Sequence, residues 1–343
     1  MLLVMDPYIR VPPDHYGGIE RVVADVADGL AASGHDVTLW AAPGSKVRGR
    51  VVAFGREGEW TRWSNARNML TLTARFMSGA HRFDVIHNFG RLAYLSSILP
   101  RDVPKVQTYM RPVTPGNMRL AARLGARRLH YTAVSAAIRR TGEPGGGDWS
   151  VIYNCAVARR YPFVAATEPS TAPLVFLGRL DRCKGVHHAI AVAERLRRRL
   201  VIAGTISPLA HEQAYFEREL APRIDGDLVR YVGPVDDAGK RALLGGAAAM
   251  LMPIEWEEPF PVVLPEAMLC GTPLIAFRRG GLPEGIDHGR TGFLCDTVDE
   301  MAALVPRLTT IDRAAVRDEA MRRFSDEAVV SAYERLYARL AAA

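Results

Sequence analysis

The chain has 343 residues, which is more than one ordinary domain needs and fits two domains of common size. Hydrophobic residues make up 48% and charged residues 24%, a balance that excludes a disordered chain, and no apolar run approaches the roughly 20 residues of a membrane-spanning helix. The formal charge of +7 is uneven, because residues 1–165 hold 22 Lys and Arg against 12 Asp and Glu, whereas the remainder holds 22 against 25.

Short β-rich runs alternate with helical patterns along the first half, which is typical of parallel α/β domains. The opening Met1–Asp6 is too short for the core of a signal peptide and therefore predicts a first strand. Apolar residues then recur at helical spacing from Ile19 to Leu30, and Gly34 closes this predicted helix. The strands predicted for this half are residues 2–5, 37–41, 51–54, 84–87, 105–108, 130–134 and 151–153.

The alternation starts again after residues 161–173, a segment rich in Pro, Ala and Thr that predicts a domain junction. We therefore expect two successive doubly wound α/β domains, over residues 1–160 and 161–326. Residues 327–340 predict a final amphipathic helix. The strands predicted for the second half are residues 174–177, 200–203, 229–232, 249–252, 274–277 and 292–294.

Two segments combine glycines or cations in a way that suits an anionic ligand. Gly17 and Gly18 open the first predicted helix, where backbone amides can approach a phosphate, although such a pair also serves plain turns. Arg179 follows the first strand of the second half, and Lys184 precedes the next helix. Both cations can converge on one anion, or they merely cap that helix in solvent.

A third segment carries two carboxylates, Glu258 and Glu266, on either side of a short apolar turn. It follows the strand-like residues 249–253, and a carboxylate at such a junction reaches a ligand above the carboxyl edge of a parallel sheet. Carboxylates accept hydrogen bonds from neighbouring hydroxyls, so two of them suit a sugar or a ribose diol. The alternative is an acidic surface turn.

These motifs and their flanks resemble the signature of the family 4 retaining glycosyltransferases of the GT-B fold. The resemblance runs from Tyr16 to the last helix, is strongest over residues 174–296, and includes GGIERVV, GHDVTLWAAPGS and EPFPVVLPEAMLCGTPLIA. It implies two Rossmann-like domains that face a deep cleft, with the C-terminal helix (residues 327–343) crossing back to the first domain. The first domain would shape the acceptor site, and the second would bind the donor.

The resemblance also implies roles for single residues. Glu258 would hold the hydroxyls of the donor sugar, and Glu266 would hold the ribose diol of the nucleotide. Arg179, Lys184 and the loop at Gly17-Gly18 would meet the donor diphosphate and stabilise its charge as it leaves. The remaining donor-binding candidates would lie along the sugar and phosphates or beside the base: Phe260, Pro261 and Val262, then Val232 and Gly233.

The chain departs from the family pattern at two places. Pro259 and Pro261 flank the phenylalanine of the turn where many relatives have Gly, so position 261 has no amide to donate. Tyr109 stands where His is common, and with an ordinary pKa of about 10 it is a poor general base at neutral pH. His87 ends another strand and is either a sugar-binding candidate or a structural residue, while Arg111 is a candidate for binding an anionic acceptor.

The function implied by the resemblance is transfer of a sugar from a nucleoside diphosphate sugar to a hydroxyl acceptor. The acceptor would be a glycan, a lipid-linked molecule or a natural product. No Asp-x-Asp triplet offers a carboxylate-rich metal site, so we expect neither metal nor cofactor. Alternatives on the same fold are a disaccharide phosphorylase, a nucleotide-sugar epimerase, and a non-catalytic basic protein that binds nucleic acid or anionic membrane.

Three further observations bear on partners and location. No helix-turn-helix, zinc or ribonucleoprotein motif is present, so we expect no nucleic acid partner. The four cysteines lack the spacing of disulfides or metal sites, which predicts a reducing cytoplasmic location. The excess of arginine in the first half indicates either contact with the anionic inner face of a membrane or a coding bias with solvated arginines.

Overall fold

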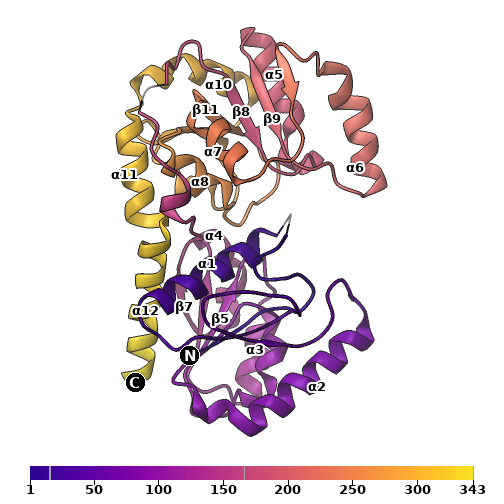
Figure 1. Cartoon of the computed structure of the whole chain (residues 1–343), viewed down its shortest axis with the longest axis vertical. Helices are drawn as coiled ribbons and strands as arrows, with labels where there is room; N and C mark the ends of the chain where they lie inside the picture. Colours follow the sequence, from indigo (N-terminus) through magenta and orange to yellow (C-terminus); the bar gives the residue numbers. More distant parts are fainter. Residues whose placement is uncertain (15–16, 166, 343) are drawn as a thin grey trace. The chain divides into compact units, whose positions relative to one another are not determined.

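The structure is a computed structural model that describes residues 1–14, 17–165 and 167–342, so Tyr16 lies outside the described residues (Figure 1). The chain divides into two compact units, one of Met1–Cys155 with Asp326–Ala343 and one of Ala156–Ser325. These junctions lie beside those expected at 160/161 and 326/327. No helix of the described residues is long and apolar enough to cross a membrane.

The first unit is built on a seven-stranded sheet in the order β3-β2-β1-β4-β5-β6-β7, and every pair of neighbours is parallel. The order reverses between β1 and β4, which are adjacent in the sheet. The predicted parallel architecture is therefore confirmed. The strands are β1 Leu2–Val4, β2 Thr38–Ala41, β3 Arg50–Ala53, β4 Ile86–Asn88, β5 Lys105–Tyr109, β6 Leu129–Ala133 and β7 Asp148–Val151.

A hydrophobic core joins this sheet to α2 and η2, which pack against each other. Leu72 and Phe76 of α2 are fully buried there, and Trp40 from β2 lies 5.0 Å from the Phe76 ring. The helices of this unit are α1 Gly18–Ala32, α2 Arg62–Gly79, α3 Gly116–Arg123, α4 Ala136–Gly142 and α12 Asp326–Ala342, with the 3-10 turns η1 Ala80–Arg82, η2 Leu92–Ile98 and η3 Glu143–Gly145.

The last helix, α12, belongs to the first unit although it ends the chain. It packs against α1, and the two helices lie close together at Gly29, where an added Cβ atom would lie 2.4 Å from Cγ2 of Val330. Tyr333 and Tyr337 on α12 are almost fully buried. The predicted C-terminal helix thus completes the core of the N-terminal unit.

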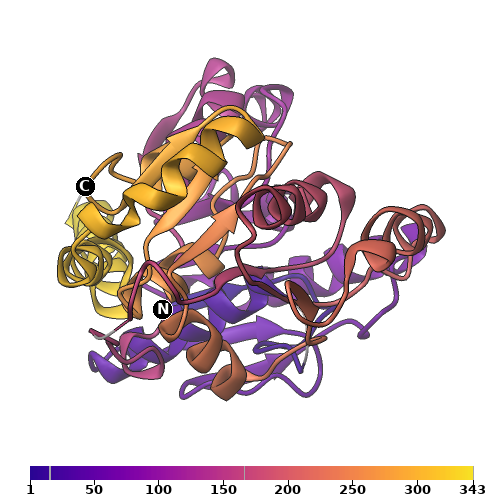
Figure 2. The same ribbon diagram turned by 90° about the horizontal axis from the view of Figure 1, so that it is seen from above.

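The second unit contains a six-stranded parallel sheet in the order β10-β9-β8-β11-β12-β13. Every residue of β11, β12 and β13 is buried, so helices must cover both faces of the sheet (Figures 1 and 2). The order reverses between β8 and β11. The strands are β8 Leu174–Leu177, β9 Leu200–Ala203, β10 Val229–Tyr231, β11 Ala249–Met252, β12 Leu274–Phe277 and β13 Gly292–Cys295.

The helices around this sheet form two packed groups. One group pairs α5 with α10, and in the other α8 packs against α7 and α11. The helices are α5 Val186–Leu196, α6 Ala210–Tyr215, α7 Asp237–Gly245, α8 Val263–Leu269, α9 Leu282–Gly285, α10 Val298–Leu304 and α11 Arg313–Phe324. Short 3-10 segments and one π-helical segment, η6, complete the unit: η4 Ala158–Arg160, η5 Arg182–Lys184, η6 Phe216–Leu220, η7 Ala221–Arg223 and η8 Val305–Thr310.

The contact at Gly29 makes a testable prediction about stability. Gly29→Ala should lower the free energy of unfolding by about 1–3 kcal/mol, because overpacking against Val330 outweighs the better helix propensity of alanine. Urea denaturation followed by tryptophan fluorescence measures the change. Gly116→Ala is the matched control, since an added Cβ meets nothing within 4 Å there. A Gly29→Ala variant as stable as wild type would contradict the close packing.

Candidate active-site residues in the two units

The chain leaves two neighbouring strands of the second unit at the point where the strand order reverses. Residues 178–185 follow β8, and residues 253–262 follow β11. Because the carboxyl ends of parallel strands share one edge of a sheet, both segments lie at this edge, where α/β proteins bind ligands. Gly185 has a φ of +75° and an added Cβ atom there would lie 1.9 Å from the carbonyl oxygen of Pro253, so the two segments are in direct contact.

This contact brings the predicted residues Lys184 and Glu258 together. Lys184 Nζ lies 2.5 Å from Glu258 Oε2, and the side chains are only 15% and 9% exposed. The same ammonium sits 5.5 Å from the centre of the Trp256 ring. Lys184 therefore fixes the direction of the Glu258 carboxylate, in addition to offering a cation at this edge.

The second predicted cation, Arg179, forms an ion pair with Asp181, which the sequence analysis did not assign a role. Burial raises the pKa of Asp181, and the Arg179 guanidinium partly offsets this effect. Asp181 is 5% exposed, whereas the side chain of Arg179 is 38% exposed. The guanidinium is thus held from its buried side by Asp181 and can meet an anion on its open side.

The turn that carries Glu258 is supported by the glycines after β12. Gly280 has a φ of +57°, and an added Cβ atom would lie 2.1 Å from the Glu258 carbonyl oxygen. The amide of Gly281 donates to that oxygen at 2.7 Å. Phe260 is buried and its ring lies 5.2 Å from that of Phe324, so it anchors the turn in the core. The backbone of this segment, with buried Pro261 and half-buried Val262, leads directly into α8.

Glu266, in the first turn of α8, is 2% exposed. Its Oε1 accepts hydrogen bonds from Tyr161 Oη at 2.7 Å and from Lys240 Nζ at 2.6 Å. Its Oε2 is equally buried and has no hydrogen-bond partner among the described residues. The sequence analysis missed Tyr161 and Lys240, because nothing in the spacing relates them to Glu266.

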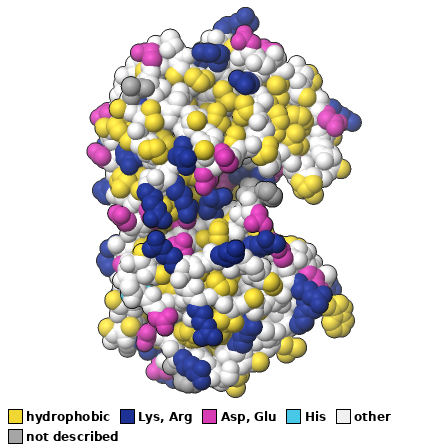
Figure 3. All heavy atoms as spheres, viewed as in Figure 1, with side chains coloured by type: hydrophobic (Ala, Val, Ile, Leu, Met, Phe, Trp, Pro, Cys, Tyr) yellow, Lys and Arg dark blue, Asp and Glu magenta, His cyan; other side chains and the backbone are white. Residues whose placement is uncertain are grey.

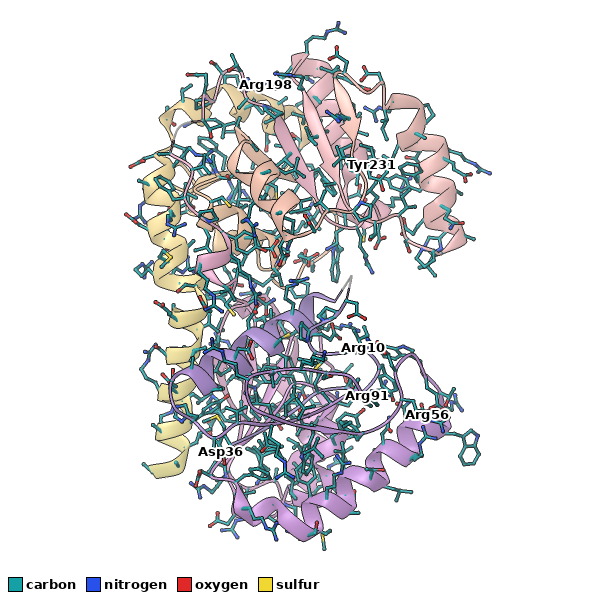
Figure 4. All side chains as sticks on the ribbon, viewed as in Figure 1. Arg10, Asp36, Arg56, Arg91, Arg198 and Tyr231 are labelled. Atoms are coloured by element: carbon teal, nitrogen blue, oxygen red, sulfur yellow. The ribbon has the colours of Figure 1, made fainter. Side chains whose placement is uncertain are left out.

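The predicted base-binding residues follow β10, beside Tyr231 (Figure 4). The Val232 amide donates to the Ile202 carbonyl oxygen at 2.9 Å, so this amide extends the sheet instead of pointing to a ligand. Gly233 has a φ of +77°, and its carbonyl oxygen accepts from the Gly204 amide at 2.9 Å. The Val232 amide and the Gly233 carbonyl oxygen are thus used within the protein, so a base would contact other atoms of this segment.

The first unit contains a cavity of about 810 Å³ at its own reversal point. Residues after β1, β4 and β5 line it, together with residues of α1, α2, η2 and α3. Most of the lining side chains are apolar, and Trp60 stacks on Tyr8 with ring centres 4.2 Å apart. The cavity could hold a ligand with a sizeable apolar or ring surface.

The polar lining of this cavity includes Asp6, Glu20, Arg91, Tyr109 and Arg111. Burial raises the pKa of both carboxyl groups, and the nearby arginines offset part of the effect. Burial also raises the pKa of Tyr109 far above its usual value, so this phenol stays protonated. Its Oη has no hydrogen-bond partner in the part of the chain that the structure describes. The predicted acceptor candidates Tyr109 and Arg111 thus share one cavity, and Figure 4 labels Arg91 in this unit.

His87 is placed differently. It is fully buried in β4 and does not line the cavity. Hydrogen bonds join its Nδ1 to Tyr337 Oη and its Nε2 to Thr108 Oγ1, each at 2.6 Å. Burial lowers the pKa of His87 well below its usual value. Of the two interpretations left open by the sequence, the structural role is the one that this geometry favours.

Gly17 and Gly18 lie at the start of α1, as expected. Gly17 caps the helix, and an added Cβ atom would lie 2.8 Å from Glu20 Oε2 and 2.9 Å from Pro13. A larger residue at position 17 would force these neighbours to shift. Backbone amides at the start of a helix suit a phosphate.

One set of possible metal ligands occurs among the described residues. The ligand atoms of His187, His188 and Glu255 all lie within 4.8 Å of one another at the start of α5. His188 Nε2 is 2.9 Å from Glu255 Oε1, and His187 Nδ1 is 2.7 Å from Tyr215 Oη. Two imidazoles and a carboxylate can bind Zn²⁺. The expectation that the protein needs no metal stays a prediction.

Two regions of the chain match known protein families. Residues 16–159 match the family described as Glycosyltransferase Family 4, and residues 172–310 match the family described as Glycosyl transferases group 1. Glycogen synthase of Mycobacterium tuberculosis is 31% identical over 367 residues, which cover 90% of this chain and 86% of that protein.

Solved structures show the same fold. AviGT4, a glycosyltransferase involved in avilamycin A biosynthesis, aligns with a TM-score of 0.71 and 28% identity over 99% of this chain and 97% of that one. Sucrose-phosphate synthase from Thermosynechococcus elongatus aligns with a TM-score of 0.78 and 20% identity over 100% and 99%. The chain therefore belongs to the family 4 retaining glycosyltransferases of the GT-B fold, which transfer a sugar from a nucleoside diphosphate sugar.

Proposed function

We propose that the second unit binds the donor through the two segments that follow β8 and β11. Glu258 accepts hydrogen bonds from the sugar hydroxyls, Glu266 holds the ribose diol, and Arg179 with Lys184 meets the diphosphate. The observation that carries this proposal is the buried pair of Lys184 and Glu258 at the carboxyl edge of the sheet. A carboxylate suits sugar hydroxyls and a neighbouring cation suits a phosphate, so this pair supports the proposal.

The transfer needs stabilisation of the charge that develops on the departing diphosphate. Arg179 supplies a planar fork of donors and Lys184 a point charge, and both are held in place before the ligand arrives. A donor phosphate oxygen would take the proton of the acceptor hydroxyl on the face that the diphosphate leaves, with retention of configuration. This mechanism uses cationic side chains in place of a metal ion.

The acceptor binds in the cavity of the first unit. Tyr109 offers a buried hydroxyl that can donate to or accept from an acceptor hydroxyl, and Arg111 can pair with an anionic group. The pKa of Tyr109 is raised far above neutral, so this phenol positions the acceptor and does not act as a base. Relatives named for glycogen synthesis and avilamycin A biosynthesis favour glycans and natural products as acceptor classes.

We further propose peripheral contact of the first unit with an anionic membrane. Trp63, Leu70 and Met77 recur every seven residues on α2 and are 86%, 72% and 59% exposed. The sequences of α2 and α3 contain five arginines and no carboxylate. Figure 3 shows apolar and basic side chains together at the start of α2, where Figure 4 labels Arg56. Exposed apolar residues with arginines suit an anionic lipid surface.

The role of Glu258 predicts the largest loss of activity. Glu258→Ala should lower kcat/KM at least 100-fold. The substitution removes the carboxylate that accepts hydrogen bonds from the donor sugar, and it leaves Lys184 without its ion-pair partner. A thermal-shift screen of UDP, GDP, ADP, dTDP and their sugar conjugates first identifies the donor. The rate of transfer is then measured from the nucleoside diphosphate released, with and without EDTA to test whether a metal ion is needed. Glu217→Gln, on an exposed turn, is the control. Near-normal turnover of a folded Glu258→Ala variant would overturn the proposed role.

The phosphate role predicts selective loss of affinity. Arg179→Ala combined with Lys184→Met should weaken binding of the nucleoside diphosphate about 100-fold and binding of the nucleoside less than about 3-fold, because only the diphosphate meets both cations. Isothermal titration measures both. Arg182→Ala is the matched control, since Arg182 pairs with Glu219 instead. Equal losses for both ligands would mean that the phosphates are held elsewhere.

The membrane contact predicts binding to anionic vesicles. Wild-type protein should sediment with phosphatidylglycerol vesicles more than with phosphatidylcholine vesicles, and Trp63→Ser with Leu70→Ser should reduce this binding about tenfold. Leu209→Ser, which changes an exposed leucine of the second unit, should leave it unchanged. Equal binding by wild type and the double variant would exclude this face of α2.

A further inference from the structure

Glu266 and its neighbours form a small buried network whose organisation goes beyond the roles proposed above. Two donors, Lys240 Nζ and Tyr161 Oη, bind the same oxygen, Oε1, and lie 2.9 Å from each other. Lys240 also lies 5.5 Å from the centre of the Tyr161 ring. All three side chains are largely buried, with Lys240 13% and Glu266 3% exposed. The three groups therefore form a closed triangle around one carboxylate oxygen.

The other carboxylate oxygen is left without a protein partner. Oε2 of Glu266 is buried, and no described residue donates a hydrogen bond to it. A buried acceptor without a partner costs on the order of 1–3 kcal/mol, and more for a charged group. Such an atom at the ligand-binding edge of the sheet indicates that a bound ligand supplies the missing hydrogen-bond donor.

Lys240 supplies the charge that makes this arrangement stable. A buried carboxylate is costly unless an opposite charge and hydrogen-bond donors compensate for the water it has lost. Lys240 is at 2.6 Å, on α7, and its second carboxylate neighbour, Asp237, lies farther away at 3.5 Å. With Oε1 held by Lys240 and Tyr161, Oε2 is the oxygen that remains to accept a hydrogen bond from a ligand.

We propose that Lys240, assisted by Tyr161, is a positioning residue that holds Oε1 of Glu266 and so directs Oε2 to the ribose diol of the nucleotide. This inference rests on the proposed function of Glu266. In this role Lys240 acts through the Glu266 carboxylate and not through its own contact with the donor. Its removal should therefore change the recognition of the diol and leave the recognition of base and phosphates unchanged.

The test compares each nucleotide with its 2′,3′-dideoxy form. Isothermal titration with UDP, GDP and ADP selects the tightest ribonucleotide, and its 2′,3′-dideoxy analogue is then titrated into wild type, Lys240→Met and Glu266→Gln. Wild type should prefer the form with ribose hydroxyls about tenfold. Lys240→Met should lose most of this preference, while its affinity for the dideoxy form stays within about twofold.

Steady-state kinetics give a second, independent readout. The diol is bound equally in the ground state and the transition state, so Lys240→Met should raise the KM of the donor about tenfold and change kcat less than about twofold. Lys240→Arg, which retains the charge, should recover most of the lost affinity. Arg241→Met removes a charge from the next position of α7 and is the matched control.

The outcomes separate the two proposals. If wild type binds both nucleotide forms equally, Glu266 does not hold the diol and the proposed function fails at that residue. If wild type prefers the hydroxyl form and Glu266→Gln loses this preference but Lys240→Met keeps it, only the role of Lys240 is overturned.

Should Lys240→Met fail to fold, Tyr161→Phe carries the test. It removes one donor and no charge, so about a threefold loss is expected and no loss overturns the proposal.

Discussion

The carboxyl edge of a parallel sheet is the constraint on which this protein depends. In each unit the strand order reverses between two neighbours, β1 with β4 and β8 with β11, and the connections on either side of that point diverge. The segments that follow these strands therefore lie together without crossing the sheet. In the first unit they surround a cavity, and in the second they bring Lys184 to Glu258.

Carboxylates and cations at the carboxyl edge of the second unit's sheet occur in ion pairs. Asp181 pairs with Arg179, Lys184 with Glu258, and Lys240 with Glu266, so that each partner restricts the movement of the other. A flexible lysine or arginine loses much rotamer freedom when it binds an anion, and a partner that fixes it beforehand reduces that loss. Preorganisation of this kind is what stabilisation of a leaving diphosphate requires.

Much of this could be predicted from the sequence, because it depends on local patterns. Apolar periodicity located the parallel strands, and the segments with Lys184, Glu258 and Glu266 stood out by residue type and spacing. The pairing of Lys240 with Glu266 could not be predicted, since it depends on how α7 docks against α8 over 26 residues of chain. His87 shows another limit. Side chains alternate between the two faces of β4, but the sequence does not reveal which face packs against α12. The burial of His87 against Tyr337 is therefore known only from the structure.

The pair of Lys184 and Glu258 has a consequence for the end of the catalytic cycle. In the proposed mechanism, the diphosphate still binds Arg179 and Lys184 after transfer, but the sugar that Glu258 held has gone. The freed carboxylate then competes for the Lys184 ammonium from within the protein, at a high effective concentration. This competition weakens binding of the nucleoside diphosphate product. Product inhibition is therefore limited by the same side chain that is proposed to bind the donor sugar.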